Sequence, residues 1–107
     1  MLALVLMAQV QDVAAQVSPA WTAEKCLRYT RAWDFATSGG GLSHLSPGFV
    51  AAHDAFLAGG CRDRGQVCPV TDAERKLADT LSLMAVAEGM AGSFLPFACP
   101  APGPAAP

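Results

Sequence analysis

The chain has few charged side chains and no cluster of basic ones. Charged residues make up 15% of its 107 residues, the formal net charge is -2, and the seven Lys and Arg residues are scattered. Proteins that bind nucleic acid need a basic patch to meet the phosphates, and polybasic membrane anchors need a run of Lys or Arg. The composition therefore argues against both functions. A disordered chain is also disfavoured, because 52% of the residues are apolar.

Long apolar runs and the short motifs of common enzymes are missing as well. A helix needs about 20 apolar residues to span a bilayer, and the apolar residues 81–87 are closely bounded by Asp79 and Glu88. The chain contains no G-x-S-x-G, no C-x-x-C and no C-x-x-C-H, and no Gly-Lys-Ser/Thr follows the three glycines at 39–41. We therefore expect no membrane span in the mature chain and no cofactor. The missing motifs favour a protein that is not an enzyme.

The N-terminus has the pattern of a secretory signal peptide. Residues 1–8 form a short apolar run, and Val13 and Ala15 stand at the -3 and -1 positions of a cleavage site before Gln16. The basic residue that usually precedes such a run is missing, and the alternative is a short buried N-terminal helix. We expect a signal peptide over residues 1–15, a folded domain over 16–99 and a disordered Pro/Ala tail over 100–107. The abundance of alanine, glycine and proline looks bacterial, so the expected destination is the periplasm or the medium.

Four cysteines follow the proposed cleavage site: Cys26, Cys61, Cys68 and Cys99. An even number of cysteines in a short exported chain is typical of a disulfide framework, and four cysteines allow three pairings. We favour Cys61–Cys68, which would close a short ring between the second and third helices, together with Cys26–Cys99. The other two pairings stay open.

Three helices are predicted, which makes the fold class all-α, with a short fourth segment as an option. Each helix begins at a residue that can cap its N-terminus, and these starts are Ser18-Pro19, Ser46-Pro47 and Thr71-Asp72-Ala73-Glu74. In the last of these, Thr71 and Glu74 fit a capping box. Glycines at 39–41 and 59–60 are expected to end the first two helices, and the third helix is expected to loosen at Gly89 and Gly92.

Apolar residues at helical spacing predict which faces are buried. The stripes are Thr22, Cys26, Tyr29, Trp33 and Ala36 in the first helix, Phe49, His53, Phe56 and Leu57 in the second, and Leu77, Leu81, Met84, Ala85 and Glu88 in the third. The third helix also has Leu83 and Val86 on its opposite side. Because a helix that is apolar all round is usually buried, we expect this helix at the centre of the fold.

His53 and Glu88 are the candidates for chemistry. His53 lies on the apolar stripe of the second helix, where a histidine could transfer protons or sense pH, although a hydrogen-bonded structural histidine is the more common case. Glu88 ends the most apolar stretch, where a buried carboxylate would have a raised pKa; the plainer alternative is a structural pair with an arginine or with a histidine such as His53. A zinc site from His44, His53, Cys61 and Cys68 is disfavoured, because C-x6-C does not match the usual ligand spacing.

Phe94, Leu95 and Phe97 surround a proline after the third helix. If these side chains are exposed, they form an apolar surface for a protein partner or a small apolar ligand. If they are buried, they belong to the core. We therefore expect an exported, non-catalytic binding or stress-related module, with a small enzyme or pH-responsive protein that uses His53 and Glu88 as the alternative.

Overall fold

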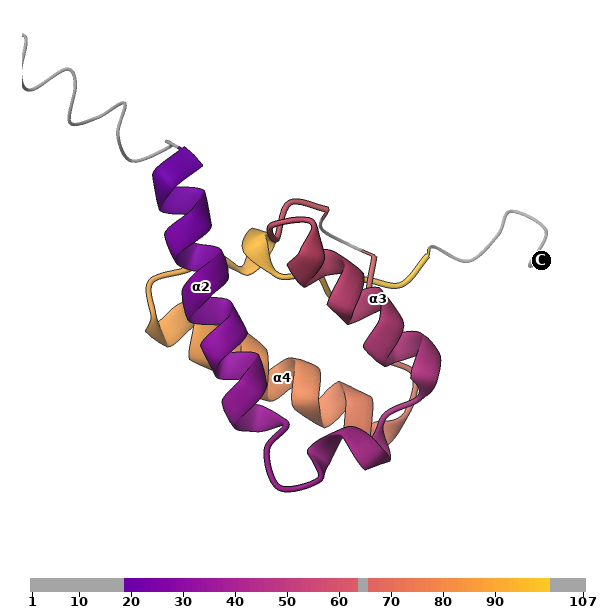
Figure 1. The fold of residues 1–107 in the computed structure, drawn as a ribbon. Coiled ribbons are helices and arrows are strands. Elements are labelled where there is room, and N and C mark those ends of the chain that lie inside the picture. Colours follow the sequence, from indigo (N-terminus) through magenta and orange to yellow (C-terminus); the bar gives the residue numbers. More distant parts are fainter. Residues whose placement is uncertain (1–18, 64–65, 101–107) are drawn as a thin grey trace, which may run out of the picture.

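The computed structural model describes residues 19–63 and 66–100, and these residues form three α-helices joined by irregular segments (Figure 1). The helices are α2 (Pro19–Ala36), α3 (Pro47–Ala58) and α4 (Asp72–Ala87), and the short 3-10 helices are η1 (Gly41–His44) and η2 (Gly92–Phe94). The predicted all-α class with two disulfides is confirmed over this part of the chain. The expected signal peptide, the Ser18 cap and residues 101–107 of the expected tail lie outside the described residues.

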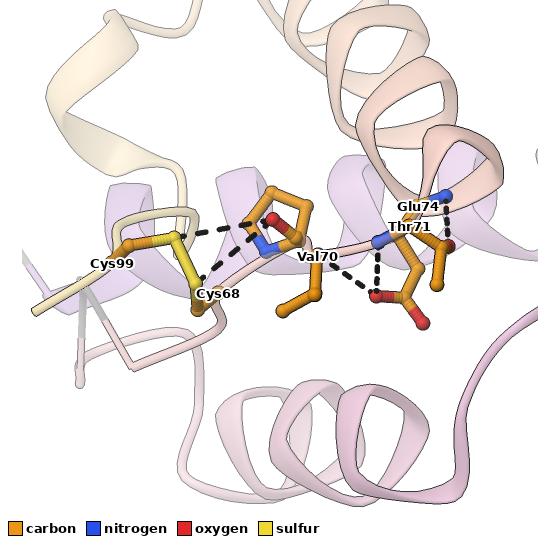
Figure 2. The surroundings of a disulfide bond; sticks show 6 residues. Cys68, Val70, Thr71, Glu74 and Cys99 are labelled. Carbon is orange, nitrogen blue, oxygen red and sulfur yellow. Dashed lines mark hydrogen bonds between the residues drawn. A yellow bond between two sulfur atoms is a disulfide. The ribbon is translucent and has the colours of Figure 1, made fainter.

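The predicted helix starts are confirmed for α3 and α4. The Phe49 N–H donates to the Ser46 hydroxyl over 3.3 Å, and Pro47 occupies the first position of α3. At α4, the Glu74 N–H donates to Thr71 Oγ1 over 3.1 Å while the Thr71 N–H donates to Glu74 Oε1 over 3.3 Å, which completes the capping box (Figure 2). These bonds satisfy N–H groups that a helix leaves free at its N-terminus.

Helices α3 and α4 end in the same way, at a left-handed glycine followed by a buried residue. Gly60 (φ 77°) and Gly89 (φ 84°) take the left-handed conformation, which glycine adopts without steric cost. The next N–H groups, of Cys61 and Met90, donate to the carbonyls of Phe56 and Ala85 over 2.9 Å in each case. Both ends are therefore Schellman motifs, and each turns the chain back toward the core.

One core holds the three helices together. Its members are the buried faces of the helices and the segments that follow them: Tyr29, Ala32, Trp33, Phe49, Phe56, Cys61, Val67, Leu81, Ala85, Met90 and Phe94. The predicted stripes of all three helices face this core, with Glu88 as the exception. The expectation that the third helix is central is wrong, because Leu83 and Val86 of α4 are 74% and 59% exposed. An all-round apolar sequence does not distinguish a buried helix from one with an apolar outer face.

The end of the described chain returns to lie beside the segment that precedes α4 (Figure 1). Val67 and Phe97 form an isolated parallel bridge. The Val67 N–H donates to the Pro96 carbonyl, and the Ala98 N–H donates to the Val67 carbonyl, over 3.0 Å in both cases. This bridge holds Phe97 against the core.

The favoured cysteine pairing is wrong: the structure joins Cys26 to Cys61 and Cys68 to Cys99. The Schellman turn at the end of α3 points Cys61 back toward α2, where Cys26 lies. The bridge between Val67 and Phe97 then sets Cys68 beside Cys99. The prediction assumed that Cys61 and Cys68 share one turn, whereas each is held by a different part of the fold.

Candidate functional site

His53 projects from α3 into the core and is completely buried. Its ring stacks on the indole of Trp33, with ring centroids 3.6 Å apart and planes inclined by 16°. Tyr29 Oη and His53 Nε2 lie 2.7 Å apart and share a hydrogen bond. The second ring nitrogen, Nδ1, is buried and has no hydrogen-bond partner among the described residues. His53 is therefore a core residue with one satisfied and one unsatisfied nitrogen.

Burial keeps both members of this pair neutral. It lowers the pKa of His53 from 6.5 to about 4 and raises the pKa of the Tyr29 phenol well above its usual value of 10, because a charged form would lose its hydration. At neutral pH the imidazole is uncharged, and no part of it reaches solvent. A substrate could approach this group only after the core opened.

Glu88 lies apart from His53, at the exposed end of α4. Its backbone carbonyl accepts a hydrogen bond from Arg28 of α2 over 3.4 Å. No hydrogen bond or ion pair joins the Glu88 carboxylate to His53 in the part of the chain that is described. The structure thus does not bring together the two candidates for chemistry.

Among the described residues it is a different carboxylate that is buried: Glu74, which is 0% exposed. Besides the capping box, its Oε2 accepts the Ser46 N–H over 2.8 Å and its Oε1 accepts the Val70 N–H over 3.0 Å. Burial raises the pKa of this carboxyl, but the hydrogen bonds from Ser46, Val70 and Thr71 outweigh burial and lower the pKa to about 2. Glu74 is a structural anion, held by backbone N–H groups.

The aromatic segment after α4 packs against the core. Phe94 is buried and meets Tyr29 and Phe56 edge to face, with centroids 6.0 and 6.2 Å away. Phe97 is half-buried and stacks on Phe49 at 6.2 Å. Leu95 is half-buried as well. The structure therefore places most of this proposed binding surface, Phe94 in particular, against the helices and not in solvent.

A groove between α2 and α4 is the surface feature that the sequence did not single out. It has a volume of about 320 Å³ and is lined by Arg28, Arg31, Ala32, Met84, Ala87 and Glu88. Ala32, Met84 and Ala87 supply its apolar lining, and the charged side chains come from both helices. We call this feature the α2–α4 groove.

Two large exposed apolar side chains lie one helical turn from residues that line the α2–α4 groove. Phe35 follows Arg31 by one turn and is 75% exposed, and Leu83 precedes Ala87 by one turn and is 74% exposed. Residues four apart lie on the same side of a helix, so Phe35 and Leu83 adjoin the groove without lining it. Leu83 was visible in the sequence as an apolar residue opposite the buried stripe of α4. The position of Leu83 was the one feature of the sequence that pointed to this surface.

No three His, Cys, Asp or Glu side chains of the described residues are placed to hold a metal ion. None of the helices in residues 19–63 and 66–100 combines the length and the apolar character that a bilayer crossing requires. Comparisons with protein-family models, with curated proteins and with solved structures gave no match.

Proposed function

We propose that the protein is an exported, non-catalytic binding module whose recognition surface is the α2–α4 groove with Phe35 and Leu83. The observation that supports it is the exposure of these two side chains, 75% and 74%, on helices whose other faces form a buried core. Scattered apolar residues on a surface are ordinary, whereas apolar residues that adjoin a groove are typical of an interaction site.

The non-catalytic part of the proposal is supported by the positions of the polar candidates. An acid or base must come within hydrogen-bond reach of the proton that it moves. His53 is enclosed by aromatic rings, and Glu88 is an exposed carboxylate at a helix end. Neither residue has the other as a partner, so neither is set up as half of a catalytic pair.

Export is supported by the N-terminal sequence and by the cysteines. Residues 1–15 fit a signal peptide, and disulfides persist in oxidising compartments such as the periplasm or the extracellular space. Both disulfides of the described residues tie separate parts of the fold together, which suits a small domain under stress conditions outside the cytoplasm.

The recognition surface can be tested with a fluorescent apolar dye added to dilute protein. We expect binding to the wild type, and we expect Leu83→Asp to remove most of it. The matched control is Leu42→Asp, because Leu42 is an exposed leucine of η1, 46% accessible, and does not line the groove. Dye binding that is missing in the wild type, or equally strong in both variants, would count against the proposal.

Export has its own test, cell fractionation followed by measurement of the intact mass of the protein in each fraction. We expect a chain that begins at Gln16 and is lighter than its reduced form by two hydrogens for each disulfide. A chain that keeps residues 1–15, or that has four free thiols, would contradict export.

A pH-responsive protein is the second candidate, favoured by the unpartnered Nδ1 of His53. Protonation would place a charge among Trp33, Tyr29 and the rings of Phe49, Phe56 and Phe97. Tyr29 is the one hydrogen-bond partner of the ring among the described residues, and no carboxylate there is bonded to it. Acid would then open the core. His53→Ala should abolish an acid-induced structural change; if the variant merely unfolds more easily at every pH, His53 is structural only.

A further inference from the structure

We infer that the occupant of the α2–α4 groove is a second copy of this chain, related to the first by a two-fold axis that runs between α2 and α4. This inference rests on the proposed recognition surface and names its partner. It has two supports, the charges on the two walls of the groove and the arrangement of its apolar side chains.

The charges at the groove are self-complementary. Arg31 stands on the α2 wall and Glu88 on the α4 wall, and both side chains are exposed. Neither side chain has an ion pair or a hydrogen bond among the described residues. Arg28, in contrast, is engaged with Glu24 over 3.3 Å. A cation on one wall and an anion on the other are what a surface needs in order to bind a copy of itself.

A two-fold axis turns each wall onto the other. In such an interface, if residue i of one chain meets residue j of its partner, then j also meets i. An axis between the helices brings Arg31 against the partner's Glu88 and Glu88 against the partner's Arg31. Both unpaired charges gain a partner of opposite sign. Opposite charges at matching positions also fix the register of an interface and exclude other arrangements.

The same axis matches the apolar side chains, because α4 crosses α2 in the opposite overall sense. Arg28, near the middle of α2, contacts Glu88 at the end of α4. Figure 1 shows α4 passing obliquely behind α2, with its overall direction opposed to that of α2. Phe35 therefore lies on the side of Arg31 that is nearer the beginning of α4. Leu83 lies on the same side of Ala87. Phe35 then faces the partner's Leu83, and by the same symmetry Leu83 faces the partner's Phe35.

The groove between these pairs is lined by small or flexible side chains. Ala32 and Ala87 project little from their helices, so they allow a second pair of helices to approach closely. Met84 can adapt its shape to the surface that covers it. A row of apolar contacts flanked by charge pairs gives the usual anatomy of an interface, with an apolar centre and a polar rim.

Sedimentation velocity over protein concentrations from micromolar to millimolar tests this inference. We expect the wild type to change from monomer to dimer with rising concentration. Leu83→Asp should stay monomeric, whereas the control Leu42→Asp should dimerise as the wild type does. A wild type that stays monomeric throughout the range would overturn the inference, as would equal dimerisation of the two variants.

Charge reversal gives the sharper test. Arg31→Glu alone and Glu88→Arg alone should each weaken the dimer by about tenfold or more, because each sets like charges against one another. The double variant Arg31→Glu/Glu88→Arg restores both pairs and should recover most of the affinity. Circular dichroism checks that every variant is folded. A double variant as weak as the single ones would refute the two-fold arrangement.

The outcome also separates this inference from the proposed function. A monomeric wild type that still binds dye at the groove, with binding lost in Leu83→Asp, would contradict the second copy and leave the recognition surface standing. A wild type that neither binds dye nor dimerises would contradict both.

Discussion

The carboxylate of Glu74 and the backbone of Ser46 are joined by a hydrogen bond of 2.8 Å that crosses from the first turn of α4 to the residue that caps α3. Glu74 therefore acts twice. It completes the capping box of its own helix and satisfies a backbone N–H at the start of the neighbouring one. No cation of the described residues pairs with its buried charge; backbone N–H groups take over the hydration that the carboxylate lost.

Replacement of Glu74 by glutamine should lower the free energy of unfolding by about 2 kcal/mol. The amide keeps the shape of the side chain but loses the charge-assisted bonds, and its NH2 group must face a backbone N–H. Urea denaturation measures the loss. Asp72→Asn is the matched control, since Asp72 is an exposed carboxylate of the same helical turn whose pair with Arg75 is on the surface. Equal losses in the two variants would contradict the role given to Glu74.

Stability should fall in acid, first because of His53. The unfolded imidazole, with a pKa of 6.5, takes up a proton more readily than the folded one, with a pKa of about 4. Unfolding is thus favoured increasingly as the pH falls from 6.5 to 4, by of the order of 3 kcal/mol in total. Urea midpoints across this range measure the slope. His53→Gln should flatten this slope, while the control His44→Gln, at an exposed histidine, should keep it. If His53→Gln keeps the slope, other groups cause the pH dependence.

Glu74 should add a second acid transition at lower pH. Its pKa is 4.5 when unfolded and about 2 when folded, so its contribution is complete above pH 4.5 and is lost as the pH falls through 2. Denaturation between pH 4.5 and 2 should therefore show a further fall in the wild type that Glu74→Gln lacks. The same slope in both proteins would show that other carboxylates cause it.

Two glycines should respond in opposite directions to alanine. Gly60→Ala forces a Cβ into the left-handed conformation at φ 77° and should destabilise the protein by about 1 kcal/mol. Gly48 lies in the first turn of α3, where an added Cβ meets nothing within 4 Å, so Gly48→Ala should stabilise by about 0.5 kcal/mol. Thermal unfolding of the two variants measures the difference. Melting temperatures that move in the same direction in both variants would argue against the Schellman turn.

The disulfide pairing can be read from a tryptic digest without reduction. The pairs Cys26–Cys61 and Cys68–Cys99 should link residues 26–28 to 32–62 and residues 65–75 to 77–107. A peptide that links residues 32–62 to 65–75 would contain Cys61–Cys68 and would contradict the structure. Mass spectrometry distinguishes the two results directly.

The helix starts could be predicted from the sequence because capping is local. Ser46 and Thr71 each bond to an N–H three residues along the chain, and a short stretch of sequence contains all the atoms involved. The buried stripes were predictable for a similar reason, since helical geometry fixes which residues share a face. Tyr29, Trp33 and Phe56 are buried as their spacing indicates.

The contacts between helices were not predictable in the same way. The bond from Ser46 to Glu74 spans 28 residues, and nothing near either residue indicates the other. The cysteine pairing depends on the direction that the Schellman turn and the Val67 bridge give to the backbone, because this direction sets which cysteines lie side by side. The candidate site was difficult for a different reason. A leucine at position 83 looks the same in the sequence whether its side chain faces the core or the surface, and only the packing of the helices decides between the two.

The two disulfides follow one another along the chain without overlapping, because the loop closed by Cys26 and Cys61 is complete before Cys68. A chain that enters an oxidising space with its N-terminus first therefore exposes one complete native pair before the third thiol arrives. The last two thiols have only each other left. If each cysteine simply joins the next one to appear, the native set forms without any reshuffling through mixed disulfides.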